Sequence, residues 1–192
     1  MNTSRMSGIG LAAALAAFAS TASADHLLEV DLSVTNQITI SATSGVSAVT
    51  ISGSQVTGFY LENLLAGGSG SLGASLVSGN LTSAENASDG SPVLYRFGLN
   101  DPGLNVYSFT TDSQASFTAG GLAFSGTATW NVSEAAYAAL TGGATEGNVY
   151  FPADDLGDLP TAQILGTYLV IPAPGAIALL GLAGLAGSRR RD

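Results

Sequence analysis

The segment 122–132 alternates apolar and polar side chains more regularly than any other part of this chain. Successive side chains of a β-strand point to opposite faces, so a period of two predicts a half-buried strand. One face would carry the apolar set Leu122, Phe124, Gly126, Ala128, Trp130 and Val132, and the other would carry Ala123, Ser125, Thr127, Thr129 and Asn131. Trp130 lies in the apolar set, which favours a place in the core over a role as an exposed sugar-stacking platform.

Shorter runs of strand-forming residues fill most of the chain between residues 28 and 171. We expect strands near 28–34, 38–40, 46–51, 93–99, 104–111, 115–119, 148–151 and 164–171. Segment 59–65 fits neither the helical nor the strand period, and the Gly- and Ser-rich segment 66–79 is expected to be a loop with one weak edge strand. The sequence Asn100-Asp101-Pro102-Gly103 is a strong turn signal between two of the strands.

One short helix is expected after residue 132. Ser133 has the side chain of an N-cap, Glu134 would sit in the first turn, and Gly142 would end a helix over 135–140. Many short strands with few helices between them predict an all-β fold, an antiparallel β-sandwich or jelly-roll-like domain with one short helix. The same pattern disfavours a parallel α/β sheet.

The first 24 residues have the three parts of a secretory signal peptide. Arg5 precedes an apolar run over 9–18, and Ala22-Ser23-Ala24 provides a site for signal peptidase. We therefore expect an N-terminal signal helix that is removed after Ala24, with the mature chain beginning at Asp25.

The last twenty-one residues combine a proline motif, an apolar run and a cluster of positive charge. The segment 175–187 contains no charged and no hydrogen-bonding side chain. A helix over 174–188 would rise about 22 Å, which is short for a bilayer core of about 30 Å. Terminal arginines can reach the headgroups, recover some of that length and stay on the cytoplasmic side. We expect a short transmembrane helix here, with a buried C-terminal helix as the alternative.

This tail resembles the PEP-CTERM sorting signal of Gram-negative bacteria. The resemblance lies in Pro172, Ala173 and Pro174, in the apolar run, and in Arg189, Arg190 and Arg191, with Ala173 where the family has Glu. It implies recognition by an exosortase, a membrane protease of the cysteine transpeptidase type, and release or attachment at the cell surface. It also implies a link with exopolysaccharide and the biofilm matrix. The resemblance covers about twenty residues and carries no information about the fold before them.

The expected organisation is a signal peptide at 1–24, a β-sandwich ectodomain at 25–171 and a sorting signal at 172–192. The two terminal segments predict the same location for the domain between them. The first would export the chain, and the second would stop its transfer with the arginines on the cytoplasmic side of the membrane. We expect a membrane-anchored precursor and then a protein at the cell surface or in the extracellular matrix.

The expected ectodomain is strongly acidic. Thirteen of the fourteen acidic residues lie in 25–171, where Arg96 is the one arginine and lysine is absent. Such a field repels nucleic acid and anionic lipid and attracts divalent cations. With no Cys in the chain and only His26 as histidine, nucleophilic triads, Lys Schiff-base chemistry and His-rich zinc sites lack their residues.

The acidic cluster Asp154, Asp155 and Asp158 is the candidate metal site, because calcium takes about six to eight oxygen ligands. Its spacing departs from the EF-hand loop, and the alternative is a solvated loop between two strands. A pair of carboxylates could instead hydrolyse a glycosidic bond, with Glu134, Glu146, Asp112 and Asp158 as candidates by residue type.

These features together predict an exported structural or adhesive matrix protein that is not an enzyme and needs no cofactor. Its expected partners are signal peptidase, an exosortase-type enzyme and extracellular polysaccharide, with no role for nucleic acid. The first alternative is a carbohydrate-binding module with calcium assistance, and the second is a carboxylate-dependent glycoside hydrolase.

Overall fold

The computed structural model describes residues 25–67, 72–86, 92–96, 98, 100–107 and 114–171. The expected signal segment and the expected sorting tail lie outside these residues, so the two predicted terminal helices belong to the part of the chain that is not described. Among the residues that the structure describes, no helix has the length and apolar character needed to cross a lipid bilayer.

The described chain consists of short strands and one helix. The elements are β1 His26–Asp31, β2 Gln37–Ala42, β3 Ile51–Ser54, β4 Phe59–Leu61, β5 Ser75–Gly79, β6 Thr82–Ser83, β7 Val93–Tyr95, β8 Leu104–Tyr107, β9 Gln114–Phe117, β10 Phe124–Ser125, β11 Thr127–Asn131, α1 Glu134–Thr141, β12 Glu146–Phe151 and β13 Gln163–Ile171. The prediction of an all-β fold with one short helix is confirmed.

Nine of the strands form one sheet in the order β5-β11-β2-β1-β13-β12-β4-β8-β7, and two small sheets pair β10 with β6 and β3 with β9. The first and last strands, β1 and β13, are parallel neighbours near the middle of the large sheet. The other pairs of described strands are antiparallel. The chain therefore closes its first strand against its last, which makes the centre of the sheet depend on both ends of the domain.

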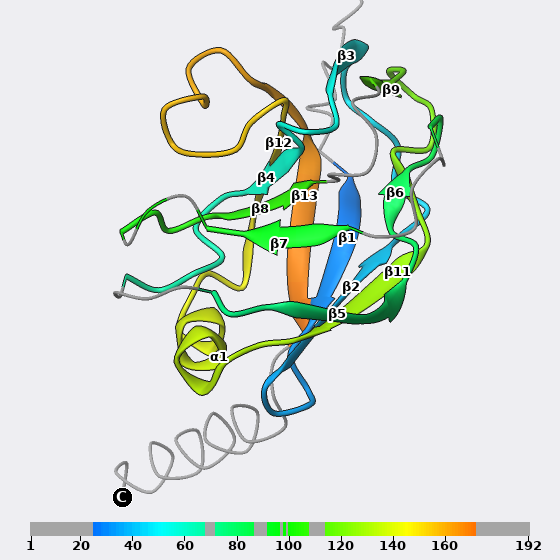
Figure 1. Cartoon of the computed structure of the whole chain (residues 1–192). Coiled ribbons are helices and arrows are strands. Elements are labelled where there is room, and N and C mark those ends of the chain that lie inside the picture. Colours follow the sequence, from blue (N-terminus) through cyan, green and yellow to red (C-terminus); the bar gives the residue numbers. More distant parts are fainter. Residues whose placement is uncertain are drawn as a thin grey trace, which may run out of the picture.

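The large sheet curls over its own core. Trp130 on β11 donates its indole N–H to the carbonyl oxygen of Pro92, just before β7, at 3.0 Å. These two strands lie near opposite ends of the sheet order, and Figure 1 shows β7 and β8 crossing over β1 and β13. Trp130 is 1% exposed, so its predicted place in the core is confirmed.

The segment 122–132 is a strand with a break, where the sequence predicted one continuous strand. Gly126 has a φ of +83°, and a Cβ there would lie 2.5 Å from the carbonyl oxygen of Asn80. The chain turns at this glycine, so β10 joins a small sheet and β11 joins the large one. Leu122 lies before the break and is 45% exposed, which corrects its predicted place on the buried face.

One predicted strand is absent from the structure, and the predicted helix is present. Residues 46–51 do not form the expected strand: Val46 makes only an isolated bridge to Leu122, and β3 begins at Ile51. The helix, by contrast, begins as predicted, because the Ser133 hydroxyl accepts from the Ala136 N–H at 3.2 Å.

A buried carboxylate fixes the turn before β8. The side chain of Asp101, 8% exposed, accepts hydrogen bonds from the Tyr60 hydroxyl, from the Gly103 N–H at 2.8 Å and from the Leu156 N–H at 3.2 Å. Arg96 donates its Nε–H to the Asp101 carbonyl oxygen at 2.6 Å. Burial, followed by the hydrogen bond to Asp101 and its charge, raises the pKa of Tyr60 above its usual range. One residue thus joins β4, the end of β7, the start of β8 and the loop after β12.

We expect Asp101→Ala to lower the free energy of unfolding by about 3 kcal/mol or more, since two buried donors, the Tyr60 hydroxyl and the Gly103 N–H, would lose their acceptor at about 1–3 kcal/mol each, and the less buried Leu156 N–H would lose its acceptor too. Denaturant unfolding followed by tryptophan fluorescence measures this, because Trp130 is buried. Asp31→Ala is the matched control: Asp31 is only half-buried and accepts one N–H, from Ser33. Similar losses for the two variants would contradict a central role for Asp101.

Candidate functional site

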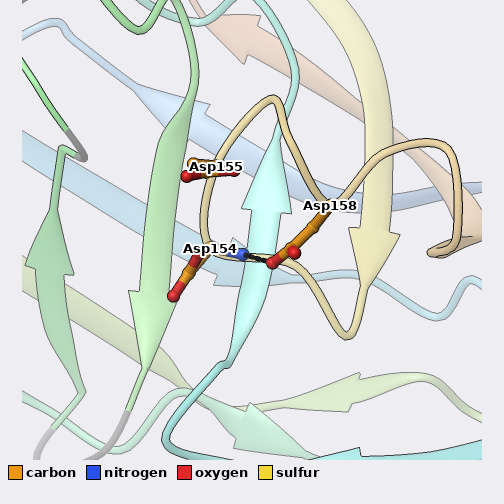
Figure 2. A group of neighbouring side chains, drawn as sticks. All are labelled: Asp154, Asp155 and Asp158. Atoms are coloured by element: carbon orange, nitrogen blue, oxygen red, sulfur yellow. Dashed lines mark hydrogen bonds between the residues drawn. The ribbon is translucent and has the colours of Figure 1, made fainter.

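The predicted acidic cluster lies on one turn of the loop that follows β12. Asp154, Asp155 and Asp158 are each half-buried, and each offers a carboxylate oxygen within 4.8 Å of the oxygens of the other two. Figure 2 shows the three side chains on this turn, with the Asp158 carboxylate directed at the backbone nitrogen of Asp154. The structure therefore brings together the three residues that the sequence singled out.

Backbone hydrogen bonds hold the loop in this shape. The Asp154 N–H donates to Asp158 Oδ2 at 3.1 Å, and the Gly157 N–H donates to Asp155 Oδ1 at 2.5 Å. The Leu156 N–H donates to the buried Asp101 carboxylate below the loop. Short Asp side chains readily cap nearby N–H groups in this way, which explains why a loop rich in Asp and Gly folds locally. The carboxylates are consequently held by the fold and not only by their neighbours in sequence.

The carboxylates of the cluster repel one another. The pKa of the Asp154 carboxyl is raised, first because it is partly buried, and then by the charges of Asp158 and Asp155, a hydrogen bond with Asp158 and the charge of Asp101. Like charges this close disfavour full ionisation. Either a proton or a bound cation relieves the repulsion, and no lysine in the chain can supply a compensating charge.

The geometry suits a hard divalent cation held at the surface. Three carboxylates can supply some of the about six to eight oxygens that calcium takes, while backbone carbonyls and waters can supply the rest. Weak calcium sites in proteins have dissociation constants of about 10⁻⁴–10⁻³ M. The arrangement can therefore stabilise the loop when a cation is bound.

The carboxylates considered for glycoside hydrolysis lie on separate elements. Glu134 is exposed in the first turn of α1, Glu146 is exposed at the start of β12, and Asp158 belongs to the acidic loop. Asp112 lies outside the described residues. The single histidine, His26, lies on β1 with its Nδ1 2.9 Å from the Thr167 hydroxyl.

The predicted processing residues lie outside the part of the chain that the structure describes. They are Ala22 and Ala24 at the expected signal cleavage site and Pro172, Ala173, Pro174, Arg189, Arg190 and Arg191 in the expected sorting tail. The described residues begin at Asp25 and end at Ile171.

A row of polar pairs on the outward face of β2 and β11 was not foreseen. The hydroxyls of Thr39 and Thr129 lie 2.8 Å apart, Thr127 donates to Ser41 at 3.1 Å, and the Gln37 amide donates to Asn131 at 3.0 Å. The alternation of 122–132 indicated the polar face of β11. It did not indicate the partner strand, because strand order depends on contacts distant in sequence.

We found no protein-family model, curated protein or solved structure that matches this chain. Its function is therefore inferred from the chemistry of its residues and from their geometry.

We expect Asp154→Asn to raise the melting temperature at pH 7 in the presence of a chelator. A raised pKa means that the folded state holds this proton more tightly than the unfolded chain does, so the stability it contributes is lost as pH rises through the folded pKa. The gain over the native chain should therefore disappear as pH falls to about 4, near the ordinary pKa of Asp. Millimolar calcium should raise the melting temperature of the native chain and have less effect on the variant.

Differential scanning calorimetry at a series of pH values, with and without calcium, measures both effects. Glu29→Gln is the control, since Glu29 is an exposed carboxylate on β1. If calcium raises the melting temperature of the native chain and of Asp154→Asn by the same amount, Asp154 is not a calcium ligand. If Asp154→Asn still melts at a higher temperature than the native chain at pH 4, the electrostatic explanation is wrong.

Proposed function

We propose that this chain is an exported structural or adhesive protein of the extracellular matrix, sorted to the cell surface through its C-terminal tail. The proposal rests on where the described strands begin and end relative to the expected signal peptide and sorting tail. The first strand begins at His26, two residues after the expected cleavage at Ala24, and the last strand ends at Ile171, one residue before Pro172. The described strands thus all lie between the two expected sorting segments.

The arrangement of β1 and β13 suits processing at both ends. The strands are parallel, with His26 near Thr167 and Asp31 paired with Ile171. The expected mature N-terminus and the attachment point of the tail therefore lie at opposite ends of the same strand pair. Hydrogen bonding reaches the final strand residue, because the Leu32 N–H donates to the Ile171 carbonyl oxygen at 3.1 Å. Cleavage beyond Ile171 leaves this pairing whole.

A carbohydrate-binding module is the second candidate, favoured by the polar face of β2 and β11. Hydroxyl and amide groups on that face are suited to hydrogen bonds with sugar hydroxyls. Glu29 and Asp31 on β1 continue the same rows, being paired with Ser41 and Thr39. Carboxylates beside these polar pairs favour neutral over anionic polysaccharides.

Deletion of residues 172–192 tests the sorting proposal. We expect the shortened chain to be exported and to keep the melting temperature of the full chain within about 2 °C, but to leave the cell surface and enter the medium. Cell fractionation and intact mass measure the outcome, and the protein recovered from the surface should begin at Asp25. Replacing Arg189, Arg190 and Arg191 with Gln is the matched variant that keeps the apolar run. A shortened chain that lodges in the envelope like the full chain would refute the proposal.

Thr39→Val with Thr129→Val tests the second candidate, because valine keeps the shape and strand preference of threonine and removes the hydroxyls. We expect retention on an insoluble neutral polysaccharide to fall about tenfold, at an unchanged melting temperature. Thr35→Val, in the exposed turn before β2, is the control. If the double variant and the Thr35→Val control are retained equally, this face does not bind the polysaccharide.

A further inference from the structure

The turn before β8 contains the one Asp–Pro bond of the chain, between Asp101 and Pro102. Such a bond is unusually easy to cleave for two reasons. The aspartate carboxylate can close an anhydride ring on its own peptide carbonyl carbon, and the prolyl nitrogen leaves as a secondary amine. The most reactive peptide bond of this chain therefore lies at a buried position, because Asp101 is 8% exposed.

The side chain of Asp101 is held against the bond that follows it. Its Oδ1 accepts the N–H of Gly103, two residues further on, at 2.8 Å. This contact closes an Asx turn, in which the side chain lies along the intervening peptide. The Tyr60 hydroxyl donates to the same oxygen, and the Leu156 N–H donates to Oδ2 at 3.2 Å. Fixing a reacting group beside its target in this way removes much of the entropy cost of the reaction.

A buried guanidinium contacts the carbonyl oxygen of the same bond. Arg96 is 9% exposed and donates its Nε–H to the Asp101 carbonyl oxygen at 2.6 Å. Its Nη2 is also buried and has no hydrogen-bond partner. The Nε–H thus meets a neutral oxygen, although a buried cation is best stabilised by a negative charge. An oxyanion at this carbonyl would supply that charge, and donors placed in this way stabilise the intermediates of acyl transfer.

We propose that the domain cleaves its own Asp101–Pro102 bond. A carboxylate oxygen of Asp101 attacks the Asp101 carbonyl carbon, and the carbonyl oxygen becomes an oxyanion beside Arg96. When this oxyanion collapses, the bond to the prolyl nitrogen breaks and the nitrogen takes a proton from the solvent. The cyclic anhydride then adds one water molecule and opens to two carboxyl groups. The net reaction is the hydrolysis of one peptide bond.

The product gives Arg96 the anionic partner that it lacks. Cleavage replaces the peptide carbonyl of Asp101 with a new α-carboxylate, and charge-assisted hydrogen bonds of this kind are roughly twice as strong as neutral ones. The residues before the bond form β1 to β7, and those after it form β8 to β13. The pairs β1 with β13, β2 with β11 and β4 with β8 join the two sets of strands. We therefore expect a cleaved domain that stays folded.

Acid should speed the reaction, because the departing nitrogen needs a proton. The titratable and charged groups around Asp101 are Tyr60 on β4, Arg96 after β7, and Asp154 and Asp155 in the acidic loop. Burial and the contact with Asp101 raise the pKa of Tyr60, so its hydroxyl keeps its proton, and an arginine keeps its charge. The pKa of Asp154 is also raised, first by burial. As pH falls, this group loses a negative charge, which favours an oxyanion nearby.

Incubation of the full chain at pH 7 and at pH 5, followed by intact mass and N-terminal sequencing, tests the proposal. We expect a single cleavage, with one fragment ending at Asp101 and the other beginning at Pro102, about tenfold or more faster at pH 5. The same chain unfolded in urea measures the intrinsic lability of an Asp–Pro bond. The folded chain should be cleaved about tenfold or more faster than the unfolded one, since only the fold brings Arg96 to the carbonyl. Equal rates in the two states, or no cleavage of the folded chain, would overturn the proposal.

Two variants test the chemistry. Arg96→Gln removes both the charge and the Nε donor and should slow cleavage by about 10²-fold or more. Pro102→Ala keeps the contacts of the Asp101 carboxylate, because the prolyl nitrogen donates none of them, and should stop cleavage. Pro160→Ala, at an exposed proline, is the matched control and should be cleaved like the native chain. If Arg96→Gln keeps the native fluorescence of Trp130 and is cleaved as fast as the native chain, the proposal is wrong.

Discussion

The buried carboxylate of Asp101 is the interaction on which most of this structure depends. A charge at 8% exposure is costly unless several donors surround it, and here the Tyr60 hydroxyl and the N–H groups of Gly103 and Leu156 do so. Gly103 leaves the necessary space, since a Cβ at that position would lie 1.8 Å from the Tyr60 ring. The network therefore fixes the order of β4, β8 and the acidic loop relative to one another.

Strand β4 contributes to this network and to a small pocket lined by phenylalanines from four strands. Its three residues are all buried, and neighbours along a strand point to opposite faces. Tyr60 reaches the Asp101 carboxylate on one side, while Phe59 lines the pocket on the other. The contact that leads to the acidic loop and the residue that lines the pocket thus lie on opposite faces of one short strand.

The sequence predicted the elements better than their connections. The Ser133 cap, the core position of Trp130, the edge strand within 66–79 and the grouping of Asp154, Asp155 and Asp158 all follow from local patterns, and the structure contains each of them. The break at Gly126 was missed, because a glycine fits an alternating pattern as well as a turn. The Ser83 hydroxyl has no hydrogen-bond partner among the described residues, and no local pattern indicated this, since a serine in a short strand looks the same with or without a partner.

By itself the sequence determined that the domain is all-β, that it is acidic, and that an apolar run lies near each end of the chain. These properties follow from periodicity, charge and composition, which act over a few residues or over the whole chain. Only the tertiary structure decided that β1 lies beside β13, that the turn at 100–103 holds a buried carboxylate, and that phenylalanines from four strands line one pocket. Each of these contacts joins residues far apart in the chain, and such pairings are selected by the packing of the whole core and not by any local preference.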